Sequence, residues 1–277
     1  MLLRPVDEMR KTGSMHSLIS SSGPTFNEMI DLAQMTSPEI ETAIKRGYTT
    51  VVFAVGSNEQ HGPCLPVSTD TVLGDTLALS VAEGLGNALK APTVNVGCSE
   101  HHMRFPGTIT LSKETLQRVV REYVGSLSRH GFKRIVVLPS HGGNFGPLGE
   151  IGDELQRRHL GIKVVVYSDL QGFVGVLMRT SESLGVSPEA SGAHAGESEV
   201  SMMLWAKGGM VRMDLIPDAG GYMGEFDEDT AQRIFEHGIG ALSPKGVLGD
   251  PAGASGRHGR AYIMDLTATL VEYIDSQ

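Results

Sequence analysis

The sequence predicts an α/β protein of three layers, in which helices cover both faces of a mainly parallel sheet. Short apolar runs rich in valine alternate along the chain with longer segments of helical spacing. Strands that read as continuous apolar runs between helices are typical of a parallel sheet that is buried on both faces. Glycine makes up 35 of the 277 residues, well above its usual share, which indicates many tight turns between these elements.

Four strands and three helices follow from these patterns. The strands are predicted at the apolar runs of residues 51–55, 92–97, 134–139 and 163–168. The helices are predicted at residues 71–85, 113–130 and 148–160. In each helical segment apolar side chains recur on one face. Gly131 and Gly161 follow the second and third helices, where a glycine C-terminal cap is expected.

We expect a single domain of residues 26–277 after an N-terminal extension of residues 1–25. The extension shows no clean periodicity and ends in a cluster of serine, glycine and proline. Such a segment is expected to be flexible or to lie over a neighbouring subunit. The remaining length is sufficient for one large hydrophobic core.

Composition narrows the class of partner and the compartment. The net charge of -9 argues against nucleic acid or an anionic membrane as the main partner, because either needs a basic surface. The two cysteines, Cys64 and Cys98, are too few for a disulfide framework. No apolar run approaches the roughly 18 residues of a membrane span, and the N-terminus lacks the apolar stretch of a signal peptide. We therefore expect a cytoplasmic protein.

Histidine-bearing loops follow three of the predicted strands. GSNEQHG comes after the first strand, CSEHH after the second and SHGGN after the third. Ligands of open α/β sheets bind in the crevice outside the carboxyl ends of the strands. The three loops are therefore expected to converge at one edge of the sheet.

The first of these loops carries Glu59 and His61. On an extended segment two residues apart, their side chains point to the same side, and a carboxylate with an imidazole suits a transition metal such as zinc or manganese. An isolated pair of this kind is more often a solvated loop. Asp70 has an equal alternative as a helix N-terminal cap, and His141 has one as a structural histidine in a turn.

Two further clusters offer candidates of the same chemistry. His101 and His102 are adjacent on an extended loop, so at most one of them is expected to face the site. His194 precedes a segment that becomes helical and carries Glu197 and Glu199. Two positions on a helix differ by about 200° of rotation, so these carboxylates cannot both face one metal. One is expected to bind and the other to have a structural role.

Five motifs in this order resemble the successive motifs of the creatininase (creatinine amidohydrolase) family. They are GSNEQHGPCLPVSTD, SEHHMRFPGTITLS, LPSHGGN, AHAGESEVSMML and GVLGDPAGASGRHG. The resemblance covers residues 50–265. It implies an α/β domain with a dinuclear metal centre and, in many members, a hexamer. It does not fix the substrate, because the family also includes formamide hydrolases, a mycofactocin-maturation peptidase and an inosose-ring hydrolase.

The resemblance assigns roles to individual residues. Glu59 and His61 would each hold one metal, Asp70 would bridge the two, and His141 would complete the shell of the first. His194 would act as general acid and base. Apart from the resemblance, we expect His102 and the backbone of the SHGGN loop to orient the substrate.

The SHGGN loop also departs from the family pattern. Creatininase proper has a metal-binding glutamate two residues after the histidine that corresponds to His141, and this chain has Gly143 there. We expect Glu197 to supply the missing carboxylate, with Glu199 as the reserve candidate. The departure also puts creatinine in doubt as the substrate.

The expected function is that of a metal-dependent amidohydrolase with two divalent ions, zinc or manganese, with iron as a further option. A hydroxide bridging the ions would attack the carbonyl carbon of a small cyclic amide or formamide. One alternative is hydrolysis of a C–C bond in an inosose-like diketo ring. Another is a non-catalytic protein that keeps the fold for assembly or ligand binding. The expected partners are a small-molecule substrate and further copies of the chain in a homo-oligomer.

Overall fold

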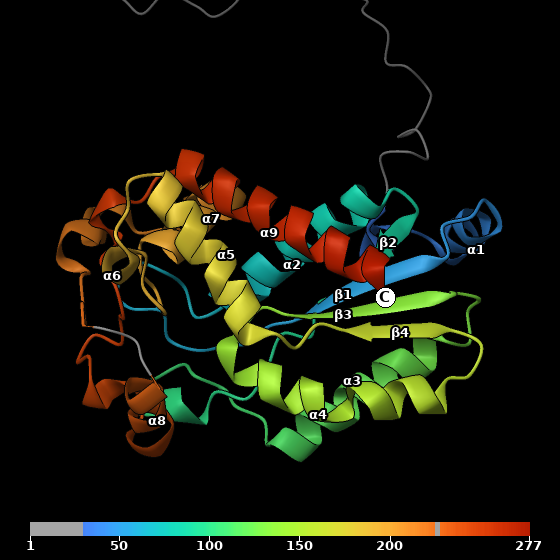
Figure 1. The fold of residues 1–277 in the computed structure, drawn as a ribbon, viewed down its shortest axis with the longest axis horizontal. Helices are drawn as coiled ribbons and strands as arrows, with labels where there is room; N and C mark the ends of the chain where they lie inside the picture. Colours follow the sequence, from blue (N-terminus) through green and yellow to red (C-terminus); the bar gives the residue numbers. More distant parts are fainter. Residues whose placement is uncertain (1–29, 225–227) are drawn as a thin grey trace, which may run out of the picture.

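The computed structural model describes residues 30–224 and 228–277, so the predicted extension of residues 1–25 lies outside the described residues. Its strands form one parallel sheet in the order β2-β1-β3-β4 (Figure 1). The strands are β1 (Thr50–Val55), β2 (Ala88–Lys90), β3 (Arg134–Pro139) and β4 (Lys163–Val166). The central strands β1 and β3 pair over their whole length, and Val55 lies opposite Pro139 at their carboxyl ends.

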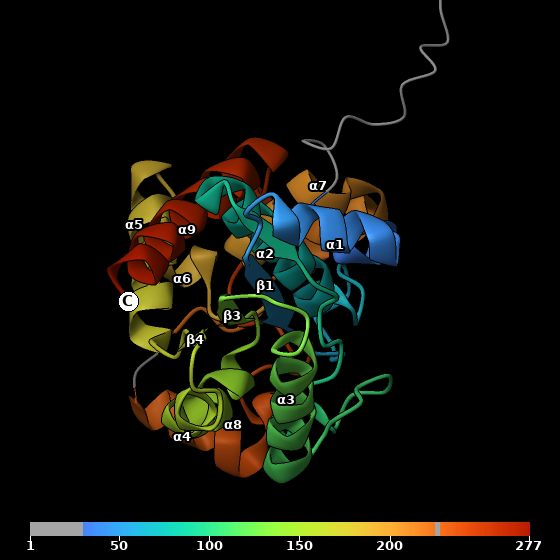
Figure 2. The ribbon, with the colours of Figure 1, turned by 90° about the vertical axis from the view of Figure 1, so that its right-hand side faces the viewer.

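Helices cover both faces of this sheet, as Figures 1 and 2 show. One layer contains α2 (Thr69–Leu85), α5 (Leu170–Ser183), α7 (Glu197–Lys207) and α9 (Gly256–Ser276). The opposite layer contains α3 (Lys113–Leu127) and α4 (Gly142–Arg158). The remaining helices are α1 (Ser37–Lys45), α6 (Pro188–Ser191) and α8 (Glu228–His237). Short 3-10 helices lie at Leu32–Gln34, Glu100–His102, Gly208–Met210, Met213–Asp218, Ile239–Ala241 and Pro251–Gly253.

The strands bury both of their faces, because successive side chains alternate across the sheet. Val52 and Ala54 of β1 belong to a core with apolar residues of α2, α7 and α9. Val51 and Phe53 belong to a second core with residues of α3 and α4. The predicted three-layer α/β fold is confirmed.

The structure corrects one predicted strand. The run at residues 92–97 contributes only an isolated bridge between Val94 and Val55, and β2 lies earlier, at Ala88–Lys90. Pro92 has no N–H to donate to the ladder, so the regular pairing ends before it.

The predicted helices are present with shifted ends. The helix predicted at residues 148–160 begins six residues earlier, because α4 starts at Gly142, directly after His141 as its N-cap residue. Gly142, Gly143 and Pro147 concealed this first part, since glycine and proline are poor helix formers. Among the described residues, no helix combines the length and apolar character needed to cross a membrane.

Candidate metal centre

Buried acidic and imidazole side chains meet at the carboxyl ends of β1 and β3. They come from the loop after β1, the start of α2, the 3-10 helix Glu100–His102, the loop after β3, the segment before α7 and the first turn of α7. The side chains that come together are Glu59, His61, Asp70, His102, His141, His194 and Glu199. The loops therefore converge as the sequence predicted.

Asp70 lies in the first turn of α2, but it is not the cap of that helix. The N-cap residue is Ser68, and the two oxygens of Asp70 face different histidines. Oδ1 lies 3.2 Å from Nε2 of His61, whereas Oδ2 lies 3.4 Å from Nδ1 of His141. The geometry of the carboxylate is that of a bridge between two positions.

Glu59 is completely buried at the centre of the cluster. Its Oε2 accepts a hydrogen bond from Ser57 Oγ at 3.1 Å. Its Oε1 lies 3.2 Å from Nδ1 of His141 and 3.3 Å from Nε2 of His102. Within the described part of the chain, Oε1 of Glu59 and Oδ2 of Asp70 are buried without a hydrogen-bond partner. Leaving such oxygens unpaired is costly, so the donor set fits a bound cation.

The outer ring nitrogens of two histidines are fixed by backbone carbonyls. His61 donates from Nδ1 to the carbonyl of Glu59 at 3.0 Å, and His141 donates from Nε2 to the carbonyl of Cys98 at 3.0 Å. When the rings are neutral, the inner nitrogens therefore carry lone pairs directed at the carboxylates. Metal-binding histidines are held in this way.

The carboxylates change the proton affinity of these two rings. Burial alone would lower the pKa of His61, but the charges of Asp70, Glu199 and Glu59 raise it to about 10. Burial also opposes the charged form of His141, and Glu59 and Asp70 nevertheless raise its pKa well above the ordinary value. In the absence of a metal, protons on these imidazoles compensate the buried acids. A divalent cation would compete with those protons.

The other two histidines of the cluster, His194 and His102, have lowered pKa values. Burial, followed by the positive charge of His61, lowers the pKa of His194 to about 3. Burial and the neighbouring histidines lower the pKa of His102 far below its ordinary value. Both rings are therefore neutral at physiological pH. His101, which precedes His102 in the sequence, stacks on His141 with ring centroids 5.7 Å apart.

The structure places Glu197 in a different set of contacts from the one expected. Its Oε1 accepts hydrogen bonds from Ser201 Oγ at 2.7 Å and His258 Nδ1 at 2.8 Å, and its Oε2 accepts one from Tyr262 at 2.7 Å. The carboxylate thus joins α7 to α9. It is Glu199 whose Oε2 lies 3.8 Å from Nε2 of His61. The rotation of two residues on a helix separates the two roles as expected, but the reserve candidate is the one at the cluster.

Asn144 and Gln60 belong to the motifs and organise the site, but no role was predicted for either from the sequence. Asn144 donates from Nδ2 to the carbonyls of Val55 and Gly56 at 3.0 and 2.9 Å and accepts from the N–H of Cys98 at 3.0 Å. It therefore ties the end of β1 to the neighbouring loop. Gln60 lies between Glu59 and His61 and contacts both His102 and His194. Its position between two candidate ligands was the available signal.

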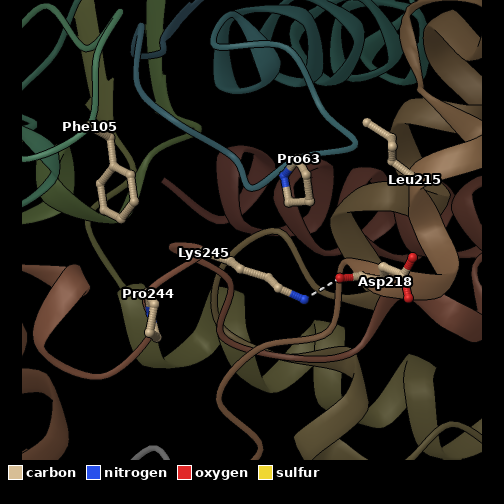
Figure 3. A pocket seen from close by; sticks show the side chains of 6 residues that line it. All are labelled: Pro63, Phe105, Leu215, Asp218, Pro244 and Lys245. Carbon is tan, nitrogen blue, oxygen red and sulfur yellow. Dashed lines mark hydrogen bonds between the residues drawn. The ribbon is translucent and has the colours of Figure 1, made fainter.

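Figure 3 shows a pocket of about 440 Å³. Its lining residues are Pro63, Phe105, Leu215, Asp218, Pro244 and Lys245. The N–H of Phe105 bonds to the carbonyl of His102, and the ammonium of Lys245 donates to the carbonyl of Asp218. The metal-centre side chains do not line this pocket, but its walls are continuous in sequence with the loops that carry them.

Comparisons with known proteins agree on one family. The creatininase model, described as creatinine amidohydrolase, matches residues 33–274. A mycofactocin precursor peptide peptidase of Mycolicibacterium smegmatis is 31% identical over 222 residues, which are 78% of this chain and 80% of that protein. A creatinine amidohydrolase of Pseudomonas putida is 30% identical over 207 residues, 70% of this chain and 78% of that protein. A crystal structure of creatinine amidohydrolase (creatininase) has a TM-score of 0.73 at 25% identity, over 90% of this chain and 98% of that one.

Proposed function

The chain belongs to the creatininase family of hydrolases, and from this premise we propose that it is a dinuclear metal-dependent hydrolase that cleaves an amide C–N bond. The observation that carries the proposal is the position of the Asp70 carboxylate, which places one oxygen beside His61 and the other beside His141. One ion would be held by Glu59, Asp70 and His141. The second would be held by His61, Asp70 and Glu199.

The donor set supports zinc or manganese. It combines imidazole nitrogens with carboxylate oxygens, which suit these ions and also iron. Divalent ions bound here would supply Lewis-acid activation of a water molecule and of the scissile carbonyl. The backbone bonds of His61 and His141 would keep the donor nitrogens in place without rearrangement.

His194 is the proposed general acid and base. Its Nε2 donates to the carbonyl of Gln60 at 2.8 Å, so its Nδ1 holds a free lone pair and lies 3.9 Å from Oε1 of Glu59. Nδ1 can accept the proton that leaves the attacking water and return it to the departing amide nitrogen. His102 presents Nε2 to the same space and would orient the substrate.

The substrate class is an amide, for which the relatives provide two examples. A creatinine amidohydrolase and a precursor peptide peptidase are similar to this chain at 30% and 31% identity. We keep the expectation of a small cyclic amide or formamide, and peptides form the second group to be assayed. The pocket of Figure 3 would hold the part of the substrate that is not cleaved, against apolar side chains such as Phe105 and Pro244.

The test is metal-dependent hydrolysis by the purified chain. We expect hydrolysis of at least one cyclic amide, formamide or peptide after loading with zinc or manganese, and none after chelation. Release of products from diketo-inositol rings alone would instead support the C–C hydrolase. A chain that binds under one ion per subunit and gains no activity with either metal would support a non-catalytic protein.

The assembly is a separate proposal. We propose a homo-oligomer, in the hexameric form that the resemblance implies. In such an assembly, exposed apolar side chains such as Ile109 and Phe235, which are 56% and 64% exposed, would be covered by a neighbouring copy. Sedimentation analysis gives the number of copies, and a monomer at all concentrations would contradict the proposal.

A further inference from the structure

Gln60 lies between two candidate ligands in the sequence, and its buried side chain contacts His102 and His194. Only 7% of the residue is exposed. Its Oε1 accepts the N–H of Gly62 at 2.9 Å, and its Nε2 donates to the carbonyl of Gly246 at 3.0 Å. The same Nε2 lies 3.0 Å from Nδ1 of His102 and 3.1 Å from Nε2 of His194.

The backbone partners fix the orientation of this amide. An N–H faces one end of the amide and a carbonyl oxygen faces the other. In the flipped orientation, the NH₂ group would meet the N–H of Gly62, and two oxygens would meet at Gly246. Only the orientation with Nε2 toward the histidines satisfies both partners.

This orientation also decides which ring nitrogen of each histidine carries the proton. Nε2 of His194 donates to the backbone carbonyl of Gln60 at 2.8 Å, so it cannot accept from the Gln60 side chain. One amide hydrogen of Gln60 goes to Gly246, and the other is left for Nδ1 of His102. A neutral imidazole has one N–H and one acceptor. His102 therefore carries its proton on Nε2, and His194 has its lone pair on Nδ1.

We propose that Gln60 is a positioning residue that gives His102 and His194 opposite roles toward the metal centre. His102 presents an Nε2–H donor, and His194 presents an Nδ1 acceptor. The use of these roles in hydrolysis rests on the proposed function, whereas the protonation of the two rings does not. Nδ1 of His102 can accept the hydrogen bond from Gln60 only in a neutral ring, and both histidines are buried, where an added charge is costly.

The proposal excludes His102 as a metal ligand. Glu59, His102 and His194 offer ligand atoms close enough to hold one ion, and on distance alone they form an alternative centre. A nitrogen that carries a hydrogen has no lone pair for a metal, so Nε2 of His102 remains a hydrogen-bond donor. Its natural partner is an acceptor oxygen of the substrate.

The carbonyl of Gly246, far away in the sequence, fixes the amide of Gln60. It lies 186 positions after Gln60 and has a φ of +72°, a backbone conformation that favours glycine. A Cβ on Gly246 would lie 2.2 Å from Oε1 of Gln60. The GVLGDP segment, a motif that supplies no predicted ligand, thus brings a carbonyl to the amide of Gln60.

The first experiment reads the ring protons of the wild-type protein in its metal-free form. Long-range ¹H–¹⁵N NMR of the histidine-labelled protein at neutral pH distinguishes the two neutral forms of each ring. We expect His102 and His194 both to be protonated on Nε2, with assignments from single His→Gln variants. A proton on Nδ1 of His102 would overturn the inference, even if the metal-loaded enzyme is active. Conversely, an enzyme without amidase activity but with both rings as expected would contradict only the proposed function.

The second experiment changes the group that faces His102. In Gln60→Glu, a carboxylate oxygen replaces the N–H donor, so the proton of His102 should appear on Nδ1 while the signal of His194 is unchanged. The turnover of the metal-loaded variant should fall at least about tenfold at unchanged metal content. Gln156→Glu is the matched control, because Gln156 also bonds two backbone groups, at Ile162 and Val164, far from the histidines. An unchanged His102 signal in a folded Gln60→Glu protein would refute the positioning role.

Discussion

Oδ1 of Asp70 lies 3.2 Å from Nε2 of His61, and both side chains are almost completely buried. The other oxygen of the same carboxylate has no hydrogen-bond partner among the residues that the structure describes. A buried aspartate is stable when each of its oxygens has a partner. This oxygen lies 3.4 Å from Nδ1 of His141, where the proposed first cation would be held.

Asp70→Asn should remove the bridge between the two ions. The amide keeps the shape of the side chain but cannot offer two anionic oxygens, so both positions are weakened. We expect metal content to fall below one ion per subunit and turnover to fall about 100-fold or more. Elemental analysis and steady-state kinetics measure the two effects. Asp153→Asn on the exposed side of α4 is the control, and equal metal content in the two variants would contradict the bridging role.

Glu199→Gln should weaken metal binding and stabilise the metal-free protein. Burial, the largest cause, raises the pKa of Glu199 to about 6, above its value of 4.5 in the unfolded chain. The folded state therefore holds more protons between these values, and stability falls as the pH rises through them. Glutamine removes this penalty and can still accept from the N–H of Ala195. We expect about 2 kcal/mol greater unfolding free energy at pH 7, measured by urea denaturation of the metal-free proteins. A loss of stability in Glu199→Gln would show that burial of the charged Glu199 carboxylate does not destabilise the metal-free protein.

Glu197→Gln should destabilise the protein and leave metal binding unchanged. The glutamine loses the charge that binds His258 and cannot serve all three donors that now meet the carboxylate. We expect a loss of about 2 kcal/mol in unfolding free energy with unchanged metal content. The comparison with Glu199→Gln separates the structural carboxylate from the binding one. Loss of an ion in folded Glu197→Gln would return Glu197 to the ligand set.

Metal binding should release protons at neutral pH. The pKa of His61 is raised to about 10 in the metal-free protein, and that of His141 is raised as well. At pH 7 both rings hold protons that the metal must displace, so about two protons leave per subunit and the apparent affinity increases with pH. Calorimetry of zinc binding in buffers of different ionisation enthalpy counts them. Binding without proton release would mean that neither ring is a ligand.

The sequence predicted the layered fold because its strands are uninterrupted apolar runs. The end of β1 at Val55 and of β3 at Pro139 placed the histidine loops at one edge, and the convergence of Glu59, His61 and His141 followed from that topology. The choice between Glu197 and Glu199 could not be made in the same way. It depends on the phase of α7, which begins at Glu197, and on the donors of α9 that approach it from the far end of the chain.

The role of Gln60 could not be predicted from the sequence either. Glutamine is compatible with an exposed loop, and its function depends on a carbonyl that lies 186 positions later. Ala195 is a similar case. It is the one non-glycine residue in the described ranges with a positive φ, at 52°, and it is held there by the bond from its N–H to Glu199. Alanine gives no local signal of such a conformation.

The most direct test of the dinuclear centre is a crystal structure of the zinc-loaded protein with anomalous diffraction. We expect two zinc peaks on either side of the Asp70 carboxylate, one beside Glu59 and His141 and the other beside His61 and Glu199. A single peak bound by Glu59, His102 and His194, with Asp70 making no contact to the metal, would contradict it.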